Sequence, residues 1–370
     1  MSVFKTRREE LYNWMAREGV ALVMFEDFED RRDPAIRWMT GQPGDALLFL
    51  SVTRQAMLVP WDINLASRYG NAEVVIPYTG FERRPVKALR AAAEYFKIPL
   101  GSRIEIPPVT SYPMFLKYVE GLSDFDVLCR EKGAREMVRR LRALKDEEEI
   151  LIYRKVSTIT NEIIDLLEDQ IRREKLRTET DIVLFIEAES RKRGCEGTGF
   201  ETLAAGPERS FGIHAFPSST AGAFAGRGLS ILDFGLKYAG YTTDVTLTFA
   251  RGPLSKQQQN LVNLVEKGYK QALSLVKEGT LVQEIAAEVG KFFGKSKKNM
   301  PHALGHGIGL EAHEAPLIRD REDDRLNPGM VFTLEPGLYD MAQGGCRLEN
   351  DILLTAAGAE VLTAARIIGL

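Results

Sequence analysis

Cysteine is scarce in this chain: its three thiols, Cys129, Cys195 and Cys346, are scattered along 370 residues. Because they are odd in number and lack metal-binding spacing, neither a disulfide framework nor a cysteine metal site is predicted. Long apolar runs are also missing. Runs such as 20–25 and 46–52 fall far short of the roughly 20 residues that a membrane-spanning helix needs. We therefore expect no membrane segment.

Neither sign of charge dominates, since 49 Lys and Arg stand against 52 Asp and Glu and give a formal net charge of -3. No polybasic tract is present that could follow a phosphate backbone, so nucleic acid is not an expected partner. The charged start, Met1 to Glu10, lacks the apolar stretch of a signal peptide. Together with the scattered thiols, this start predicts a cytoplasmic protein.

The first part of the chain has an α/β pattern. A helical pattern at 85–96 lies among short strand-like runs, at 20–25, 46–52, 55–60, 73–78 and 103–107. A helix is then expected to begin near Asp146, after a charged segment at 130–145. The length of the chain favours about two domains, and we expect them at 1–140 and 141–370.

The second domain is predicted to pack helices on one face of an antiparallel sheet. Two of these helices have capping-box spacing at their starts, Thr178 with Asp181 and Thr280 with Gln283. After Gly228 the pattern changes to strands joined by turns that contain glycine. The predicted fold class is therefore α/β followed by α+β.

A weak internal repeat brings acidic residues into the strands of this domain. Leu-Asp-Phe-Gly-Leu at 232–236 resembles Leu-Glu-Pro-Gly-Leu at 334–338, and Asp244 and Glu349 follow at similar distances. We expect a hairpin with its turn at 237–240 and with Asp233 opposite Asp244. Side chains of directly opposite residues in a hairpin lie close together, so these two carboxylates would repel each other unless a cation lies between them. The alternative is that these acids are solvated hairpin or edge-strand residues.

Histidine is rare as well, yet three of the four histidines lie within 302–313. Glycines at 305, 307 and 309 argue against a helix there and allow close backbone approach. Imidazole beside carboxylates is a mixed N and O ligand set that suits Mn, Co, Fe or Zn, and carboxylates can bridge two ions. The sequence therefore favours a dinuclear metal site, although a lone histidine is more often structural.

These residues, with their flanking segments, resemble the five-ligand pattern of the pita-bread metallopeptidases. The pattern consists of Asp233, Asp244, His306, Glu335 and Glu349. The group includes methionine aminopeptidases, Xaa-Pro aminopeptidases, prolidases and the metal-free creatinases. The resemblance covers about 145–370, and the segment 36–41 is similar to the creatinase/prolidase amino-terminal domain. The resemblance implies that a creatinase/prolidase-type amino-terminal domain is followed by a pita-bread domain, which is a curved antiparallel sheet covered by helices. The amino-terminal domain points to the proline-directed branch of the family.

The resemblance also implies a role for each ligand. Asp233 would bind one ion, Asp244 and Glu349 would bridge two, and His306 with Glu335 would hold the second. Mn is the first expectation for these two divalent ions, with Co, Zn or Fe as alternatives. A hydroxide that bridges the metals would attack the substrate.

Three further side chains and the acid Glu335 complete the implied site. Glu335 would transfer the proton as general base and then acid. His214 and His313 match the two histidines of the family that hold the substrate carbonyl and the developing oxyanion. Arg347 would offset the net negative charge from outside the ligand set. His302 is given no role and is expected to be structural or to line the pocket.

The expected function is hydrolysis of the Xaa-Pro bond at the amino terminus of peptides or in dipeptides, by a homodimeric enzyme. The alternatives are a non-catalytic binding protein of the same fold and a peptidase without proline specificity. Three departures from the common pattern bear on specificity rather than on metal binding: the segment 214–228 lacks a His-Gly-x-Pro-Ser run, Leu247 replaces a frequent Arg, and Cys346 replaces a frequent Val.

Overall fold

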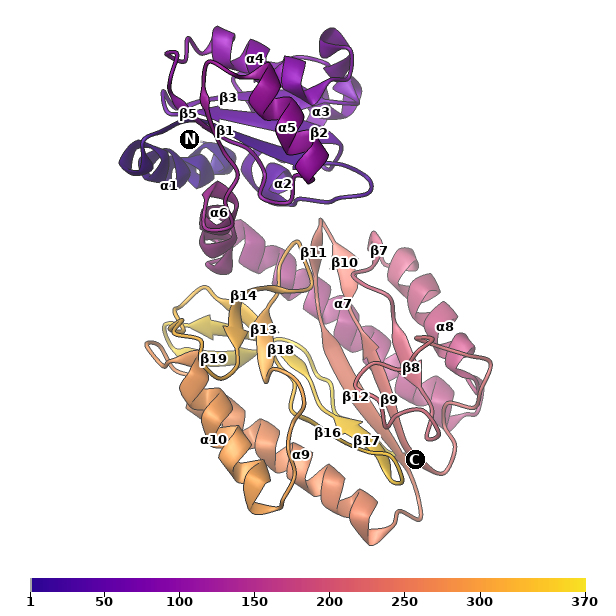
Figure 1. The fold of residues 1–370 in the computed structure, drawn as a ribbon. Helices are drawn as coiled ribbons and strands as arrows, with labels where there is room; N and C mark the ends of the chain where they lie inside the picture. The colour runs from indigo at the N-terminus through magenta and orange to yellow at the C-terminus, as the bar shows by residue number, and fades with distance from the viewer. Residues whose placement is uncertain (1) are drawn as a thin grey trace. The chain divides into compact units, whose positions relative to one another are not determined.

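The computed structural model describes residues 2–370, and the chain divides into two compact units between Arg142 and Ala143. This division falls close to the boundary expected between residues 140 and 141. The two units are built on different plans (Figure 1). Among the residues described, no helix is both long enough and apolar enough to cross a membrane.

The first unit is a mixed six-stranded sheet with the strand order β4-β3-β2-β1-β5-β6. Its strands are β1 (Val20–Asp27), β2 (Ala46–Ser51), β3 (Gln55–Pro60), β4 (Val74–Val75), β5 (Arg103–Glu105) and β6 (Asp126–Leu128). Its helices are α1 (Val3–Glu18), α2 (Ala35–Thr40), α3 (Ile63–Tyr69), α4 (Pro85–Tyr95), α5 (Tyr112–Gly121) and α6 (Ala134–Ala143), with a 3-10 turn at Tyr78–Phe81. The strand expected at 73–78 is shorter than predicted, because Pro77 has no N–H to donate and the 3-10 turn follows at once.

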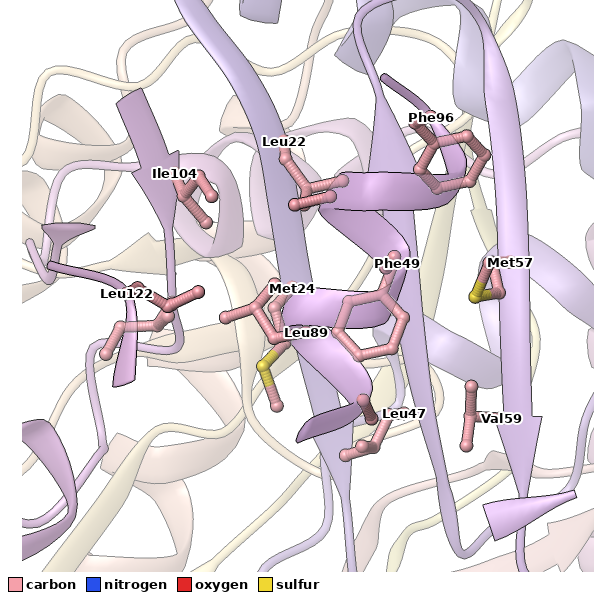
Figure 2. Close-up of a cluster of buried hydrophobic side chains, with 14 of the residues drawn as sticks. Leu22, Met24, Leu47, Phe49, Met57, Val59, Leu89, Phe96, Ile104 and Leu122 are labelled. Carbon is pink, nitrogen blue, oxygen red and sulfur yellow. The ribbon is translucent and has the colours of Figure 1, made fainter. Parts of the chain in front are cut away.

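The core of this unit follows the two-residue period of its strands. Figure 2 shows alternate residues of β1, β2 and β3, among them Leu22, Phe49 and Met57, on the same side as Leu89 of α4. All six residues of β2 are buried, so both faces of the sheet are covered. Each fully buried Leu or Phe stabilises the fold by roughly 1.5–3 kcal/mol.

The second unit combines four long helices with two principal sheets. The helices are α7 (Glu147–Arg172), α8 (Glu179–Lys192), α9 (Lys256–Leu275) and α10 (Val282–Lys295). One sheet has the order β20-β12-β9-β8 and the other β14-β13-β15-β18-β19. These strands are β8 (Leu203–Ala205), β9 (Gly228–Phe234), β12 (Val245–Arg251), β13 (Gly305–Gly307), β14 (Glu314–Ile318), β15 (Val331–Leu334), β18 (Asn350–Thr355), β19 (Gly358–Val361) and β20 (Ile367–Gly369). All pairs in the two sheets are antiparallel except β12 with β20.

Smaller strands extend the two hairpins of this unit beyond the sheets. In the first hairpin, β10 (Leu236–Tyr238) and β11 (Tyr241–Thr242) continue β9 and β12, and in the second, β16 (Gly337–Asp340) and β17 (Gly344–Arg347) continue β15 and β18. A further short strand, β7 (Gly197–Thr198), pairs with β10. The two sheets meet where Thr246 and Glu349 exchange backbone hydrogen bonds of 3.4 and 3.1 Å. The helices lie on the outside of the sheets, as Figure 1 shows for α9 and α10. The predicted fold class is confirmed.

Side chains at the helix starts explain where most of the long helices of this unit begin. Asp146 caps α7 and Thr178 caps α8, each in a reciprocal capping box. The sequence predicted the capping box at Thr178 and, near Asp146, the start of a helix. The capping box predicted at Thr280 is wrong: α10 begins at Val282, and no side chain caps it. The backbone around Thr280 instead pairs with another segment, since Val282 N donates to Asp324 O and Leu326 N donates to Thr280 O.

The first hairpin has a different register from the predicted one. Asp233 pairs with Thr246, so it does not lie opposite Asp244. The turn decides this register, because Tyr238 pairs with Tyr241 and leaves Ala239 and Gly240, both at positive φ, at the two central positions. Asp244 therefore lies diagonally across from Asp233.

Candidate active site

The four acids of the predicted ligand set lie where hairpin strands break or begin. Asp233 is the second-last residue of β9 and Asp244 directly precedes β12. Glu335 directly follows β15 and Glu349 directly precedes β18. In the second hairpin one register holds on both sides of the break, which places Glu335 across from Glu349. The repeat seen in the sequence therefore corresponds to two hairpins that each present two acids.

A cavity of about 580 Å³ opens between these hairpins. All eight residues singled out in the sequence line it: Asp233, Asp244, His306, Glu335, Glu349, His214, His313 and Arg347. Its size lies within the range of roughly 300–1,000 Å³ that is typical of ligand sites. Residues more than 130 positions apart in the sequence therefore share one space.

His306 of β13 lies between the two pairs of acids. Its Nε2 atom is 3.6 Å from Asp244 Oδ2 and 3.7 Å from Glu335 Oε1. One potential ligand atom from each of Asp244, His306 and Glu349 lies within 4.8 Å of the others, and all three side chains are buried. These groups are close enough to hold a common metal ion.

Arg347 connects two of the acids through hydrogen bonds. Its guanidinium donates to Asp233 Oδ2 at 2.5 Å, to the Thr246 hydroxyl at 2.9 Å and to the Tyr339 hydroxyl at 2.8 Å. The Thr246 hydroxyl in turn donates to Glu349 Oε2 at 2.7 Å. Arg347 therefore orients one acid directly and a second acid through Thr246.

Burial dominates the ionisation of the site. It raises the pKa of Asp233 and raises those of Asp244 and Glu335 well above their usual values. Burial, and next the Asp233 carboxylate, raise the pKa of Glu349 to about 7. The imidazole of His306 is affected in the opposite direction, since burial lowers its pKa to about 4. Metal-free acids in this cavity are therefore poorly stabilised as anions, whereas the imidazole is neutral and able to bind a metal.

The acceptor atoms left over fit a divalent cation. Within residues 2–370, Asp233 Oδ1 and Glu349 Oε1 are buried and accept no hydrogen bond. A buried carboxylate oxygen is costly unless it is paired or bound to a metal. Four carboxylates and one neutral imidazole are a ligand set that suits divalent transition metals.

The remaining histidines surround this cluster. The ring of His313 lies 4.3 Å from that of His306, centroid to centroid. His302, which had no assigned role, lies 3.1 Å from the Tyr339 hydroxyl and 3.6 Å from Glu335 Oε2. His214 lines the same cavity.

Three residues of the site were missed or left without a role by the sequence analysis. Thr246 and Tyr339 carry the hydrogen bonds of Arg347, and the carboxylate of Asp351 accepts the backbone N–H of Asp244 at 3.2 Å. Thr246 could have been found from the correct hairpin register, since it pairs with Asp233. Asp351, two residues after Glu349, has no comparable signal in the sequence.

Comparison with known proteins places this geometry in a family. The profile of metallopeptidase family M24 matches residues 152–356. The chain belongs to this family. The match confirms the prediction that the chain is a pita-bread metallopeptidase.

Individual relatives extend the similarity beyond the residues that the profile matches. The Xaa-Pro dipeptidase of Pyrococcus furiosus is 31% identical over 284 residues, which are 75% of this chain and 79% of that protein. The solved X-Pro aminopeptidase of Thermotoga maritima has a TM-score of 0.84 at 25% identity and covers 98% of this chain and 99% of its own. The Xaa-Pro dipeptidase of Bacillus anthracis has a TM-score of 0.85 at 24% identity, over 99% and 100% of the two chains. The last comparison shows the fold alone.

Proposed function

We propose that the chain is a metal-dependent exopeptidase that hydrolyses the bond between an amino-terminal residue and a following proline. The observation that carries this proposal is the convergence of four acids and His306 on one cavity, with Asp244, Glu349 and His306 buried and Asp233 and Glu335 only partly exposed. Family membership supports the peptidase chemistry, and relatives named Xaa-Pro dipeptidase and X-Pro aminopeptidase support the proline specificity.

Two divalent ions would be held by the five proposed ligands, Asp233, Asp244, His306, Glu335 and Glu349. Mn²⁺ is our first choice and Co²⁺, Zn²⁺ and Fe²⁺ are the alternatives, since all accept mixed carboxylate and imidazole ligands. When bound, such ions lower the pKa of water and polarise a carbonyl group. Their charge of +4 would balance the four acidic ligands.

The protein side chains provide proton transfer and orientation. Glu335 moves a proton from the attacking water to the leaving nitrogen, and its oxygens lie within 3.7 Å of His306 and His302. His214 and His313 line the cavity, and they would donate to the scissile carbonyl as negative charge develops on it. Arg347 fixes the orientation of Asp233.

An apolar part of the wall suits the proline ring. Phe200, Leu203 and Ile213 line the cavity beside the charged cluster. Proline offers no N–H, so the wall must recognise its ring by apolar contact instead of by a hydrogen bond.

We also propose that the enzyme is cytoplasmic and that it is a homodimer. Light scattering of the purified protein tests the oligomeric state.

The decisive experiment uses metal-stripped protein resupplied with Mn²⁺, Co²⁺ or Zn²⁺. Release of alanine from Ala-Pro or Ala-Pro-Ala, with no cleavage of Met-Ala-Ala, would support the proposal. Cleavage of Met-Ala-Ala at comparable rates would replace it with a peptidase of broader specificity. Inactivity with every ion, together with no metal binding by calorimetry, would favour a binding protein.

A further inference from the structure

The charges that line the active-site cavity determine whether a free carboxylate after the proline of the substrate is tolerated. Apart from the five proposed ligands, the charged side chains on its wall are Glu201 and Arg347. Within residues 2–370, no lysine lines the cavity. A substrate carboxylate that enters this space has few positive groups to meet.

The single guanidinium of the cavity is already engaged with the protein. Its nitrogen atoms donate to Asp233, Thr246 and Tyr339 and, at 2.9 Å, to the carbonyl oxygen of Ile213. The Arg347 side chain is only 2% exposed. To bind a substrate carboxylate, Arg347 would have to give up contacts that orient Asp233.

The imidazoles of the wall are also largely engaged. His306 belongs to the proposed ligand set, His302 contacts Tyr339 and Glu335, and His313 lies against the ring of His306. His214 is assigned above to the scissile carbonyl. None of these groups supplies the fixed positive charge that pairs well with a carboxylate.

The other described residues of the wall carry no positive charge. Leu317 lines the cavity on β14, directly paired with His306 of β13. Glu201 is exposed and accepts a hydrogen bond of 2.6 Å from Ser218, a second residue of the wall. Two divalent ions would balance the four acidic ligands, and the charge of Arg347 is buried against Asp233. The exposed charge of Glu201 is therefore the one that a nearby carboxylate meets, and it repels that carboxylate.

We propose that this cavity selects peptides in which the proline is followed by an amide, that is tripeptides and longer, and discriminates against free Xaa-Pro dipeptides. The carboxylate of a dipeptide would meet Glu201 and the apolar Leu317 without a free cation, whereas the neutral amide of a longer peptide would not. This inference rests on the proposed function, because it assumes cleavage before proline.

The test compares Ala-Pro, Ala-Pro-amide and Ala-Pro-Ala with the Mn²⁺-loaded enzyme. We expect kcat/KM for the amide and the tripeptide to exceed that for Ala-Pro by about tenfold or more. Two unreactive ligands give a binding measurement: Ala-Pro with its peptide bond reduced to CH2–N, once as the free acid and once as the amide. Calorimetry should show that the amide binds more tightly than the acid. Equal or better use of Ala-Pro would overturn this inference and leave the proposed function intact. Failure to cleave any of the three would overturn both.

Two variants locate the source of the discrimination. Leu317→Arg should raise kcat/KM for Ala-Pro relative to the amide by about tenfold, because it adds the missing cation. Glu201→Gln removes an exposed negative charge with little risk to folding. It should reduce the ratio of kcat/KM for Ala-Pro-amide to kcat/KM for Ala-Pro. Leu184→Arg on α8, an exposed leucine outside the cavity wall, is the matched control. A ratio that stays unchanged in both cavity variants would contradict the proposal.

Discussion

The guanidinium of Arg347 lies 2.5 Å from the carboxylate of Asp233, and this contact joins strand β17 of one hairpin to strand β9 of the other. The Arg347 side chain is 2% exposed and that of Asp233 is 14% exposed, so the pair is largely shielded from water. A buried acid whose cation is removed retains its cost of desolvation. The two halves of the site therefore depend on this contact for their alignment.

Replacement of Arg347 tests how much this ion pair contributes to stability. We expect Arg347→Met to lower the free energy of unfolding of the metal-free protein by about 3–5 kcal/mol, because it leaves Asp233 without its cation. Urea denaturation measures this change. The double variant Arg347→Met/Asp233→Asn should recover part of the loss, and a single variant as stable as the parent protein would contradict the role given to the pair.

A second buried pair holds the segment that carries His313. Lys145 Nζ lies 3.4 Å from Glu314 Oε2, and both side chains are 1% exposed. We expect Lys145→Met to destabilise the protein by roughly 3 kcal/mol, and Lys145→Met with Glu314→Met to cost less than the sum of the single changes. Thermal unfolding of the four proteins of this double-mutant cycle gives the coupling energy. Strict additivity would show that the two side chains act independently.

Residue type, spacing and the family resemblance were sufficient to predict that the four acids and His306 come together, and these five residues line one cavity. They were not sufficient for the register of the first hairpin. That register depends on which two residues adopt positive φ, and the structure uses Ala239 and Gly240. Lys145 and Glu314 are 169 positions apart, and no local pattern in the sequence relates them.

The capping box predicted at Thr280 failed for a related reason. The motif was present in the sequence, but this segment pairs with residues 324–326, where Val282 N donates to Asp324 O, and the helix begins only at Val282. A local motif predicts a helix start only where no distant segment competes for the same groups.

Replacement of Asp244 should abolish activity without unfolding the chain. We expect Asp244→Asn to lower metal affinity by more than about a hundredfold, since a proposed bridging ligand loses its charge. The metal-free variant should be at least as stable as the parent, because the pKa of Asp244 is raised well above its usual value by burial and then by Glu349. Metal content after dialysis, kcat/KM and urea denaturation test these points. Glu288→Gln is the control, since this half-exposed acid lies on α10 and pairs with Lys291. Full turnover by Asp244→Asn would contradict the bridging role.

Removal of the metals should give the stability a distinctive dependence on pH. Burial raises the pKa of Glu349 to about 7 and raises that of Glu335 well above its usual value, so both are protonated in the folded, metal-free protein under conditions in which the unfolded chain is ionised. The folded state then binds more protons, and stability falls as the pH rises. His306, with a pKa lowered to about 4, acts in the opposite direction, but only below the ordinary histidine pKa of about 6.5.

Above about pH 6.5 the acids therefore decide the slope. We expect the metal-stripped protein to lose about 1 kcal/mol of unfolding free energy per pH unit between pH 6.5 and 8 for each acid that is still protonated. Urea denaturation at pH 6.5, 7.2 and 8 in the presence of a chelator measures this loss. With saturating Mn²⁺ the decline should vanish, since a metal ion replaces the protons and binds more tightly as the pH rises. Metal-free stability that increases over this range would mean that the acids are ionised in the folded state, and the proposed need of this cluster for a cation would then lose its physical basis.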